Sequence, residues 1–168
     1  MQTFLDQPEA TFYHITPLEN LESICREGIK GRHHEIFVSR VGEMPVLAAI
    51  IMEQLVHDIQ EASGIAVLKI PQALNHFTTA DIFEDYRAPV ERTGVLQNMI
   101  RRALIPVGCF ETMLTIEFRE HRDFYFGLFN QLAQQANLLY PKQVIYQRAR
   151  ALNVNKFPNK LPEWNPSS

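Results

Sequence analysis

The sequence has few cysteines, no long apolar run and no excess of positive charge. The only cysteines, Cys25 and Cys109, are too few for a disulfide framework or a cysteine-based zinc site. Their number alone does not exclude one disulfide bond between them, but we expect both to be buried free thiols. The longest apolar run, residues 46–52, is far shorter than the ~20 residues of a membrane-spanning helix, and the N-terminus lacks the pattern of a signal peptide. We therefore expect no membrane association and a protein that is cytoplasmic, or exported without a cleaved signal peptide.

The charge balance excludes a general attraction to polyanions. The chain has 16 Lys and Arg and 19 Asp and Glu, which gives a net charge of -3 with neutral histidines. Binding of a polyanion is therefore possible only at local basic patches. The 168 residues are 46% hydrophobic, enough for one core. We expect a single domain over residues 1–154 and an extended, proline-containing tail over residues 155–168.

Several motifs of common enzyme classes are missing. The seven glycines form neither a G-x-G-x-x-G nor a G-x-x-x-x-G-K-[ST] pattern, which argues against dinucleotide-fold and P-loop enzymes. No H-E-x-x-H or G-x-S-x-G is present. His33 and His34 could not both bind one metal from a strand, because adjacent side chains point to opposite faces. We therefore expect no metal.

The hydrophobic pattern predicts an α+β domain. Pro17 opens a helix that Gly28 caps, and Pro45 opens a second helix that ends at Gly64. Helix and strand do not alternate strictly after Pro71, which disfavours a doubly wound sheet. The expected strands are residues 11–15, 35–39, 65–70, 82–90, 113–118 and 144–146, and the expected helices are residues 18–27, 45–64, 94–102 and 124–139.

One N-terminal run carries a specific motif. Residues 13–29 read Y-H-x-T, three residues, N-L-x-x-I, three residues, G-I. This resembles the opening of ADP-ribosyltransferase-fold proteins, above all the DNA-targeting ADP-ribosyltransferase toxins and, more remotely, the RNA 2'-phosphotransferases. Less specific similarity continues through residues 36–39, 65–74 and 104–116. The resemblance implies a split, bent β core with flanking helices and an NAD-sized cleft.

The resemblance also implies a set of site residues. His14 and Thr16 would hold the nicotinamide-side ribose of NAD, and Ser39, at the end of the second strand, would also be a cofactor-binding residue. Arg40 is a candidate for the pyrophosphate, because a guanidinium fork pairs well with phosphate oxygens. A carboxylate near the ribose would stabilise the oxocarbenium-like state that forms when the nicotinamide bond breaks.

The carboxylate is where the sequence departs from the family pattern. The expected position, about eight residues before Pro106, falls on Gln97 and Asn98, and neither amide supplies a negative charge. Glu84, Glu91 and Glu111 are the alternatives, and we predict Glu91. The toxins' aromatic stretch after the second strand is replaced by residues 44–49, which puts their DNA-base specificity in doubt here.

Three functions follow from these features. The first is transfer of ADP-ribose from NAD to a macromolecular acceptor, which is DNA, RNA or protein. The second is an NAD- or nucleotide-binding or interaction module without catalysis, consistent with the amides at residues 97 and 98. The third is RNA 2'-phosphate removal, which needs basic residues such as Arg101, Arg102, Arg148 and Arg150 to converge.

A fainter similarity joins residues 104–106, 118–124 and 133–134 to the C-terminal part of flavin-dependent thymidylate synthases, without their R-H-R motif.

Strand alternation gives one further expectation about His14. In a strand over residues 11–15, Phe12 and His14 share one face, while Thr11, Tyr13 and Ile15 share the other. We expect the His14 face to line the cleft.

Overall fold

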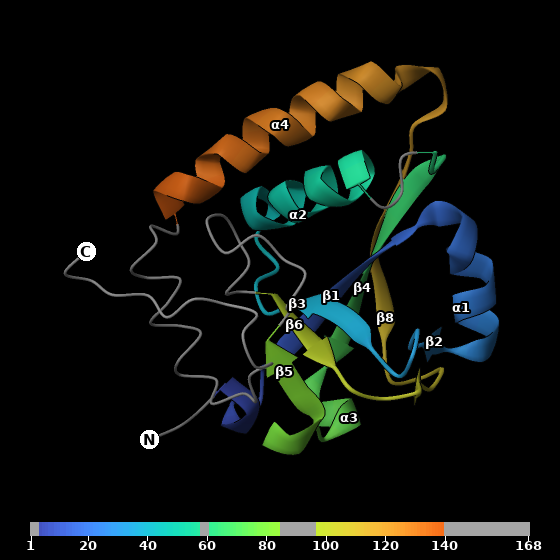
Figure 1. Ribbon diagram of the computed structural model, residues 1–168, viewed down its shortest axis with the longest axis vertical. Helices are drawn as coiled ribbons and strands as arrows, with labels where there is room; N and C mark the ends of the chain where they lie inside the picture. Colours follow the sequence, from blue (N-terminus) through green and yellow to red (C-terminus); the bar gives the residue numbers. More distant parts are fainter. Residues whose placement is uncertain (1–3, 58–60, 85–96, 140–168) are drawn as a thin grey trace.

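A computed structural model describes residues 4–57, 61–84 and 97–139 (Figure 1). The expected tail, the edge strand at residues 144–146, Glu91, Arg148 and Arg150 lie outside these described residues. Within them, strands and helices form an α+β arrangement, as predicted.

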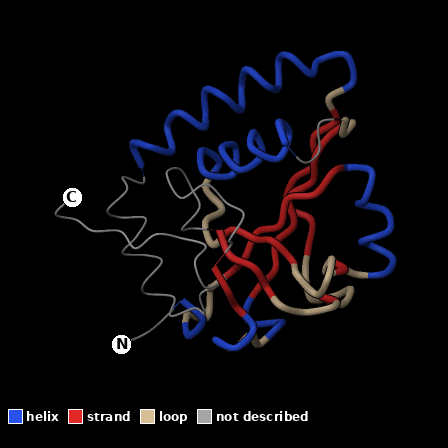
Figure 2. The backbone as a smooth tube through the Cα atoms, in the orientation of Figure 1, coloured by secondary structure: helices blue, strands red, loops and turns tan. Residues whose placement is uncertain are grey.

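The central feature is a six-stranded sheet (Figure 2). Its strands lie in the order β5-β6-β3-β1-β4-β8, and all neighbouring strands run antiparallel. A second, two-stranded sheet pairs β2 with β7. The strands are β1 (Thr11–Pro17), β2 (Ile29–Lys30), β3 (Ile36–Ser39), β4 (Gly64–Pro71), β5 (Ile82–Glu84), β6 (Gln97–Ile100), β7 (Leu104–Ile105) and β8 (Glu111–Glu117).

The helices cover the sheet unevenly. The two long helices, α2 (Met44–His57) and α4 (Arg122–Leu139), pack against each other on one side of the sheet (Figure 1). The short helices are α1 (Leu21–Glu27) and α3 (Gln72–Asn75), and single 3₁₀ turns occur at Phe4–Asp6, Leu18–Asn20, Thr79–Asp81 and Arg119–His121.

Two apolar clusters lie on the two faces of the sheet. On the α2 and α4 side, Ile15, Ile65 and Val67 pack with α2 residues and with Phe118 and Phe129. On the other side, the cluster consists of Phe12, Ile24, Ile29, Ile36, Val38, Leu68, Ile70, Phe77, Ile82, Ile100 and Ile105. The predicted alternation along β1 is confirmed, because Phe12 and Ile15 belong to different clusters.

Most predicted elements are present, with shifted ends. The first helix begins as a 3₁₀ turn, and Gly28 caps it at φ 95° with its N–H donating to the Ile24 carbonyl at 2.8 Å. Gly64 does not stop the second helix, because residues 61–63 already form a turn and Gly64 begins β4. A Cβ on Gly64 would collide with the Ile116 carbonyl oxygen, so the β4–β8 approach requires glycine.

Three predictions were wrong. The expected helix at residues 94–102 is replaced by β6 from residue 97, where Met99 and Ile100 are both fully buried. A strand buried on both faces shows no alternation, so its pattern resembles that of a buried helix. Cys25 is exposed, because it lies on the outer side of α1 while Ile24 faces the core. Cys109, the other thiol expected to be buried, is only half-buried. His33 and His34 lie in a turn, outside the predicted strand at residues 35–39.

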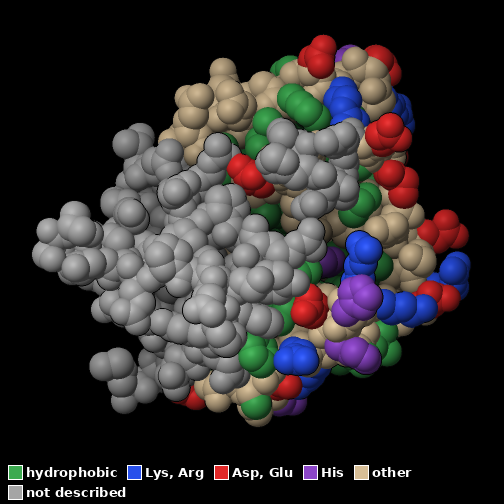
Figure 3. All heavy atoms as spheres, viewed as in Figure 1, with side chains coloured by type: hydrophobic (Ala, Val, Ile, Leu, Met, Phe, Trp, Pro, Cys, Tyr) green, Lys and Arg blue, Asp and Glu red, His purple; other side chains and the backbone are tan. Residues whose placement is uncertain are grey.

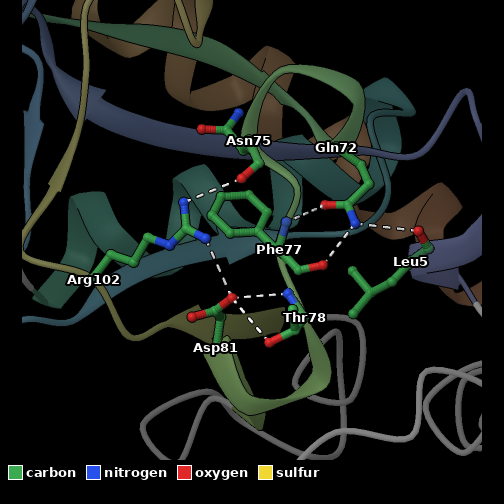
Figure 4. Close-up of polar contacts among 7 residues, drawn as sticks. All are labelled: Leu5, Gln72, Asn75, Phe77, Thr78, Asp81 and Arg102. Atoms are coloured by element: carbon green, nitrogen blue, oxygen red, sulfur yellow. Dashed lines mark hydrogen bonds and ion pairs between the residues drawn. The ribbon is translucent and has the colours of Figure 1, made fainter.

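A polar cluster fixes the end of β6 against α3 (Figure 4). The Arg102 guanidinium donates to the Asn75 carbonyl and to the Asp81 carboxylate, both at 3.3 Å, and lies 4.4 Å from the centre of the Phe77 ring. Asp81 also accepts a bond from the Thr78 N–H at 2.8 Å. Arg102 is therefore held within the fold.

Candidate functional site

His14 lies where the two halves of the six-stranded sheet meet. β1 pairs with β4 along its whole length, from Thr11 opposite Pro71 to Pro17 opposite Ile65. Its pairing with β3 is much shorter and consists of Tyr13 opposite Ser39. Beyond that pair, the Nδ1 atom of His14 lies 2.7 Å from the Phe37 carbonyl oxygen. A side chain thus continues the connection between β1 and β3.

This contact determines the state of the imidazole. A carbonyl oxygen only accepts hydrogen bonds, so Nδ1 of His14 carries the proton and donates it to Phe37. Burial lowers the pKa of His14 below its ordinary value, and the bond to the Phe37 carbonyl opposes this shift only in part. The ring is therefore neutral near pH 7, which leaves Nε2 as a hydrogen-bond acceptor.

Thr16 lies on the same face of β1 as His14, two residues further along the strand. Its side chain is buried, with 3% of the residue exposed, and its hydroxyl oxygen accepts a bond from the Asn20 amide at 3.4 Å. Asn20 belongs to the N-L-x-x-I part of the N-terminal motif, although no site role was predicted for it. The four-residue spacing between Thr16 and Asn20, at the start of the helical segment, is the sequence feature that could have predicted this contact.

Ser39 lies on the other face. Its register with Tyr13 places it opposite the His14 side of the sheet. The Ser39 hydroxyl donates to the Val41 carbonyl at 2.9 Å and accepts from the Val41 N–H at 3.1 Å, which shapes the turn before α2. The structure therefore does not bring Ser39 together with His14.

Arg40 follows Ser39 directly and is almost entirely buried, with 8% of the residue exposed. The residue already takes part in an interaction within the protein. This burial leaves little of its surface for a phosphate group of a ligand.

The carboxylate candidates differ in their positions. Glu111 is exposed on β8 and pairs with Lys69, which itself pairs with Tyr13, so Glu111 is on the face opposite His14. Glu84 is in register with Asn98 at the β5–β6 edge of the sheet. Glu91 lies outside the described residues.

Asn98 shares the face of His14. It pairs with Val38 on β3, and two strand spacings place it about 10 Å from the line of β1. Asn98 is 1% exposed; its amide donates to the Phe83 carbonyl at 3.3 Å, while its side-chain oxygen has no hydrogen-bond partner in the described structure. Gln97 pairs with Ser39 and so lies on the opposite face.

Within the described residues, no three His, Cys, Asp or Glu side chains gather closely enough to hold a metal ion. The same part of the chain contains no helix long and apolar enough to cross a bilayer.

Comparisons of this chain with protein-family models, with curated proteins and with solved structures found no match. The resemblance to ADP-ribosyltransferases therefore stays an expectation from the N-terminal motif.

Proposed function

We propose that this protein transfers ADP-ribose from NAD to a macromolecular acceptor and that its sheet is a split core of the ADP-ribosyltransferase type. The observation that carries the proposal is the position of His14 at the β1–β3 junction, with its ring fixed by the Phe37 carbonyl. In a core of that type the binding site lies where two halves of the sheet separate, and the short pairing of β1 with β3 beside His14 supports the proposal.

The state of His14 suits contact with a ribose. Its neutral Nε2 accepts a hydrogen bond from a ribose hydroxyl, while the Nδ1 bond to Phe37 prevents the ring from turning away. Thr16 on the same face supports the ribose end through its hydroxyl, which Asn20 orients. Ser39 has no part in this proposal, since its hydroxyl shapes the turn at Val41.

The charged groups are assigned by position. Glu91 is the proposed carboxylate, because Glu111 is on the other face of the sheet. Arg40 is the proposed pyrophosphate residue only if its interaction within the protein opens on binding. In the reaction, the carboxylate stabilises positive charge on the ribose as the nicotinamide bond breaks, and the acceptor atom then forms the new bond at the same carbon.

A second candidate is a module that binds NAD without transferring ADP-ribose. The observation that favours it is Asn98, a buried amide on the His14 face at the position where the family pattern has a carboxylate. An amide can hold a hydroxyl group but cannot balance an oxocarbenium charge.

Two measurements test these candidates in sequence. NAD that binds only the folded state raises the melting temperature, so a thermal shift titration up to millimolar NAD detects either function. Incubation of the purified protein with labelled NAD and cell lysate then separates them, since transfer labels a protein or a nucleic acid. A melting temperature unaffected by NAD contradicts both candidates.

A further inference from the structure

The long helix α4 is held firmly against the rest of the protein on one side. Phe126, Phe129 and Leu132 pack into the apolar cluster on the α2 side of the sheet. At the start of the helix, the Arg122 guanidinium donates to the Ala62 carbonyl at 2.7 Å and lies 4.9 Å from the centre of the Phe126 ring. The opposite side of α4 therefore has a fixed position on the surface of the protein.

That outer side carries two large apolar side chains that the protein leaves uncovered. Phe124 is 66% exposed, and Leu128, one helical turn further on, is 37% exposed. Residues four positions apart are neighbours on a helix surface, so the two side chains form one apolar ridge. Gly127, three residues after Phe124, lies beside this ridge. We call these three residues the α4 contact face.

Gly127 has no role in the packing of α4 within the protein. A glycine inside a helix is destabilising relative to alanine, so its presence there needs a reason. Among the described residues, a Cβ on Gly127 would meet no atom within 4 Å. The missing side chain leaves a depression beside the apolar ridge, where the backbone of α4 is open to a second helix.

The α4 contact face lies on an uncharged surface. The sequence has no Lys, Arg, Asp, Glu or His from Phe124 to Leu139, and the exposed side chains at residues 130, 131, 134 and 135 are amides. In Figure 3, charged side chains gather where α4 begins, at the upper right, whereas the surface shown at the upper left is not charged. A partner that placed a charge on this face would bury it without a counter-charge. The partner that fits is therefore another uncharged helix face, which α4 itself supplies.

We propose that the α4 contact face binds the same face of a second copy of this chain across a two-fold axis. With the two helices antiparallel, Phe124 of each copy lies against Leu128 of the other copy and beside its Gly127. Each face supplies one projecting ring and one depression, so the surface is complementary to itself, as a two-fold interface requires. This inference does not depend on the proposed function.

The size of the contact sets the expected affinity. The 18 residues of α4 span about 27 Å, and a face about 10 Å wide gives roughly 270 Å² per copy. A standard protein interface buries about 800 Å² per partner. We therefore expect a weak dimer, with a dissociation constant of roughly 10 to 100 µM.

The test is sedimentation equilibrium of the full chain from about 5 to about 500 µM, a range that brackets this dissociation constant. The mean mass of wild type should rise from monomer towards dimer. Phe124→Lys and Leu128→Glu should each raise the dissociation constant more than about tenfold, because each places an unpaired charge in the contact. Val107→Lys is the matched control, since Val107 is a 54% exposed apolar residue in the β7–β8 turn, and it should associate as wild type does.

The decisive experiment mixes Phe124→Lys with Leu128→Glu in equal amounts. In the proposed pair, the introduced ammonium of one copy lies against the introduced carboxylate of the other, while the second Phe124–Leu128 contact keeps its natural residues. The mixture should therefore associate although neither variant does so alone. Gly127→Ala should raise the melting temperature at low concentration, because alanine favours the helix, and should weaken association, because its Cβ fills the depression.

Four results would overturn the inference. The first is a wild-type chain that stays monomeric up to about 500 µM, and the second is a dimer that persists in Phe124→Lys. The third is an equal loss of association in Val107→Lys, which would place the contact elsewhere or make it unspecific. The fourth is a mixture of Phe124→Lys and Leu128→Glu that stays monomeric while both variants have the circular dichroism spectrum of wild type.

Discussion

The imidazole of His14 donates from Nδ1 to the carbonyl oxygen of Phe37 at 2.7 Å, across the place where the two halves of the sheet meet. Because the bond needs a proton on Nδ1 and burial disfavours a second proton, the folded protein holds this ring neutral. The same property determines how His14 would contact a ligand and how the stability of the protein depends on pH.

The first prediction is that stability decreases in mild acid because of His14. Its folded-state pKa is lowered from the ordinary value of 6.5, so the unfolded chain binds the proton more readily. The contribution is complete above about pH 6.5 and is lost as the pH falls below it, by at most about 1.4 kcal/mol per pH unit. Urea denaturation between about pH 7.5 and 5 should show a shallower pH dependence for His14→Gln than for His121→Gln, the exposed control. Equal pH dependence in the two variants would contradict this.

The second prediction separates a ligand-binding role of His14 from a structural one. His14→Ala should abolish the NAD-induced thermal shift. It also removes the bond to the Phe37 carbonyl, which should cost roughly 1 to 3 kcal/mol of stability whether or not His14 binds a ligand. An intact NAD-induced shift in the folded variant refutes the proposed role.

The third prediction concerns Arg102 in the polar cluster. Arg102→Ala removes two hydrogen bonds and the contact with the Phe77 ring, so the free energy of unfolding should fall by about 1 to 2 kcal/mol. Arg101→Ala, a neighbouring exposed arginine, is the control and should cost less than about 0.5 kcal/mol. Chemical denaturation of both variants checks this, and equal losses would count against the cluster.

The fourth prediction concerns Glu19, which connects the turn before α1 to the turn before β4. Its carboxylate accepts bonds from the Ser63 hydroxyl at 2.6 Å and from the Ser63 N–H at 2.9 Å. The Ser63 hydroxyl is the main cause of the lowered pKa of Glu19, so this stabilisation is present above about pH 4.5 and is lost as the pH falls further.

Because Glu19 is exposed, Glu19→Gln should cost no more than about 1 kcal/mol at neutral pH. The difference from wild type should shrink in acid, as measured by thermal denaturation at both pH values. Glu22→Gln, an exposed residue of α1, is the control, and a difference that does not change with pH would argue against the Ser63 contact.

The fifth prediction concerns thiol reactivity. Cys25 is exposed and Cys109 is half-buried, so a thiol reagent should modify Cys25 first under native conditions. Mass spectrometry of Cys25→Ser and Cys109→Ser over time measures the two rates, and faster modification of Cys109 would contradict the placement of α1.

The sequence alone predicted the elements with a clear period or boundary. The strand at residues 11–15 was predicted, and the geometry of a strand then gave its two faces, while Pro17 and Gly28 delimited the first helical segment. It also singled out His14, since the motif around this residue is local. These features depend on backbone preferences and on neighbours within a few residues, which a sequence displays directly.

Only the tertiary structure decided where these parts meet. Residues 97–100 form a strand because β3 and β5 supply hydrogen-bond partners on both sides, a contact between distant segments that no local pattern contains. The register of those strands, and not the order of residues, placed Asn98 on the face of His14 and Ser39 on the other. A shift by one residue would exchange the two faces, because side chains alternate along a strand and register is determined by pairing over long range.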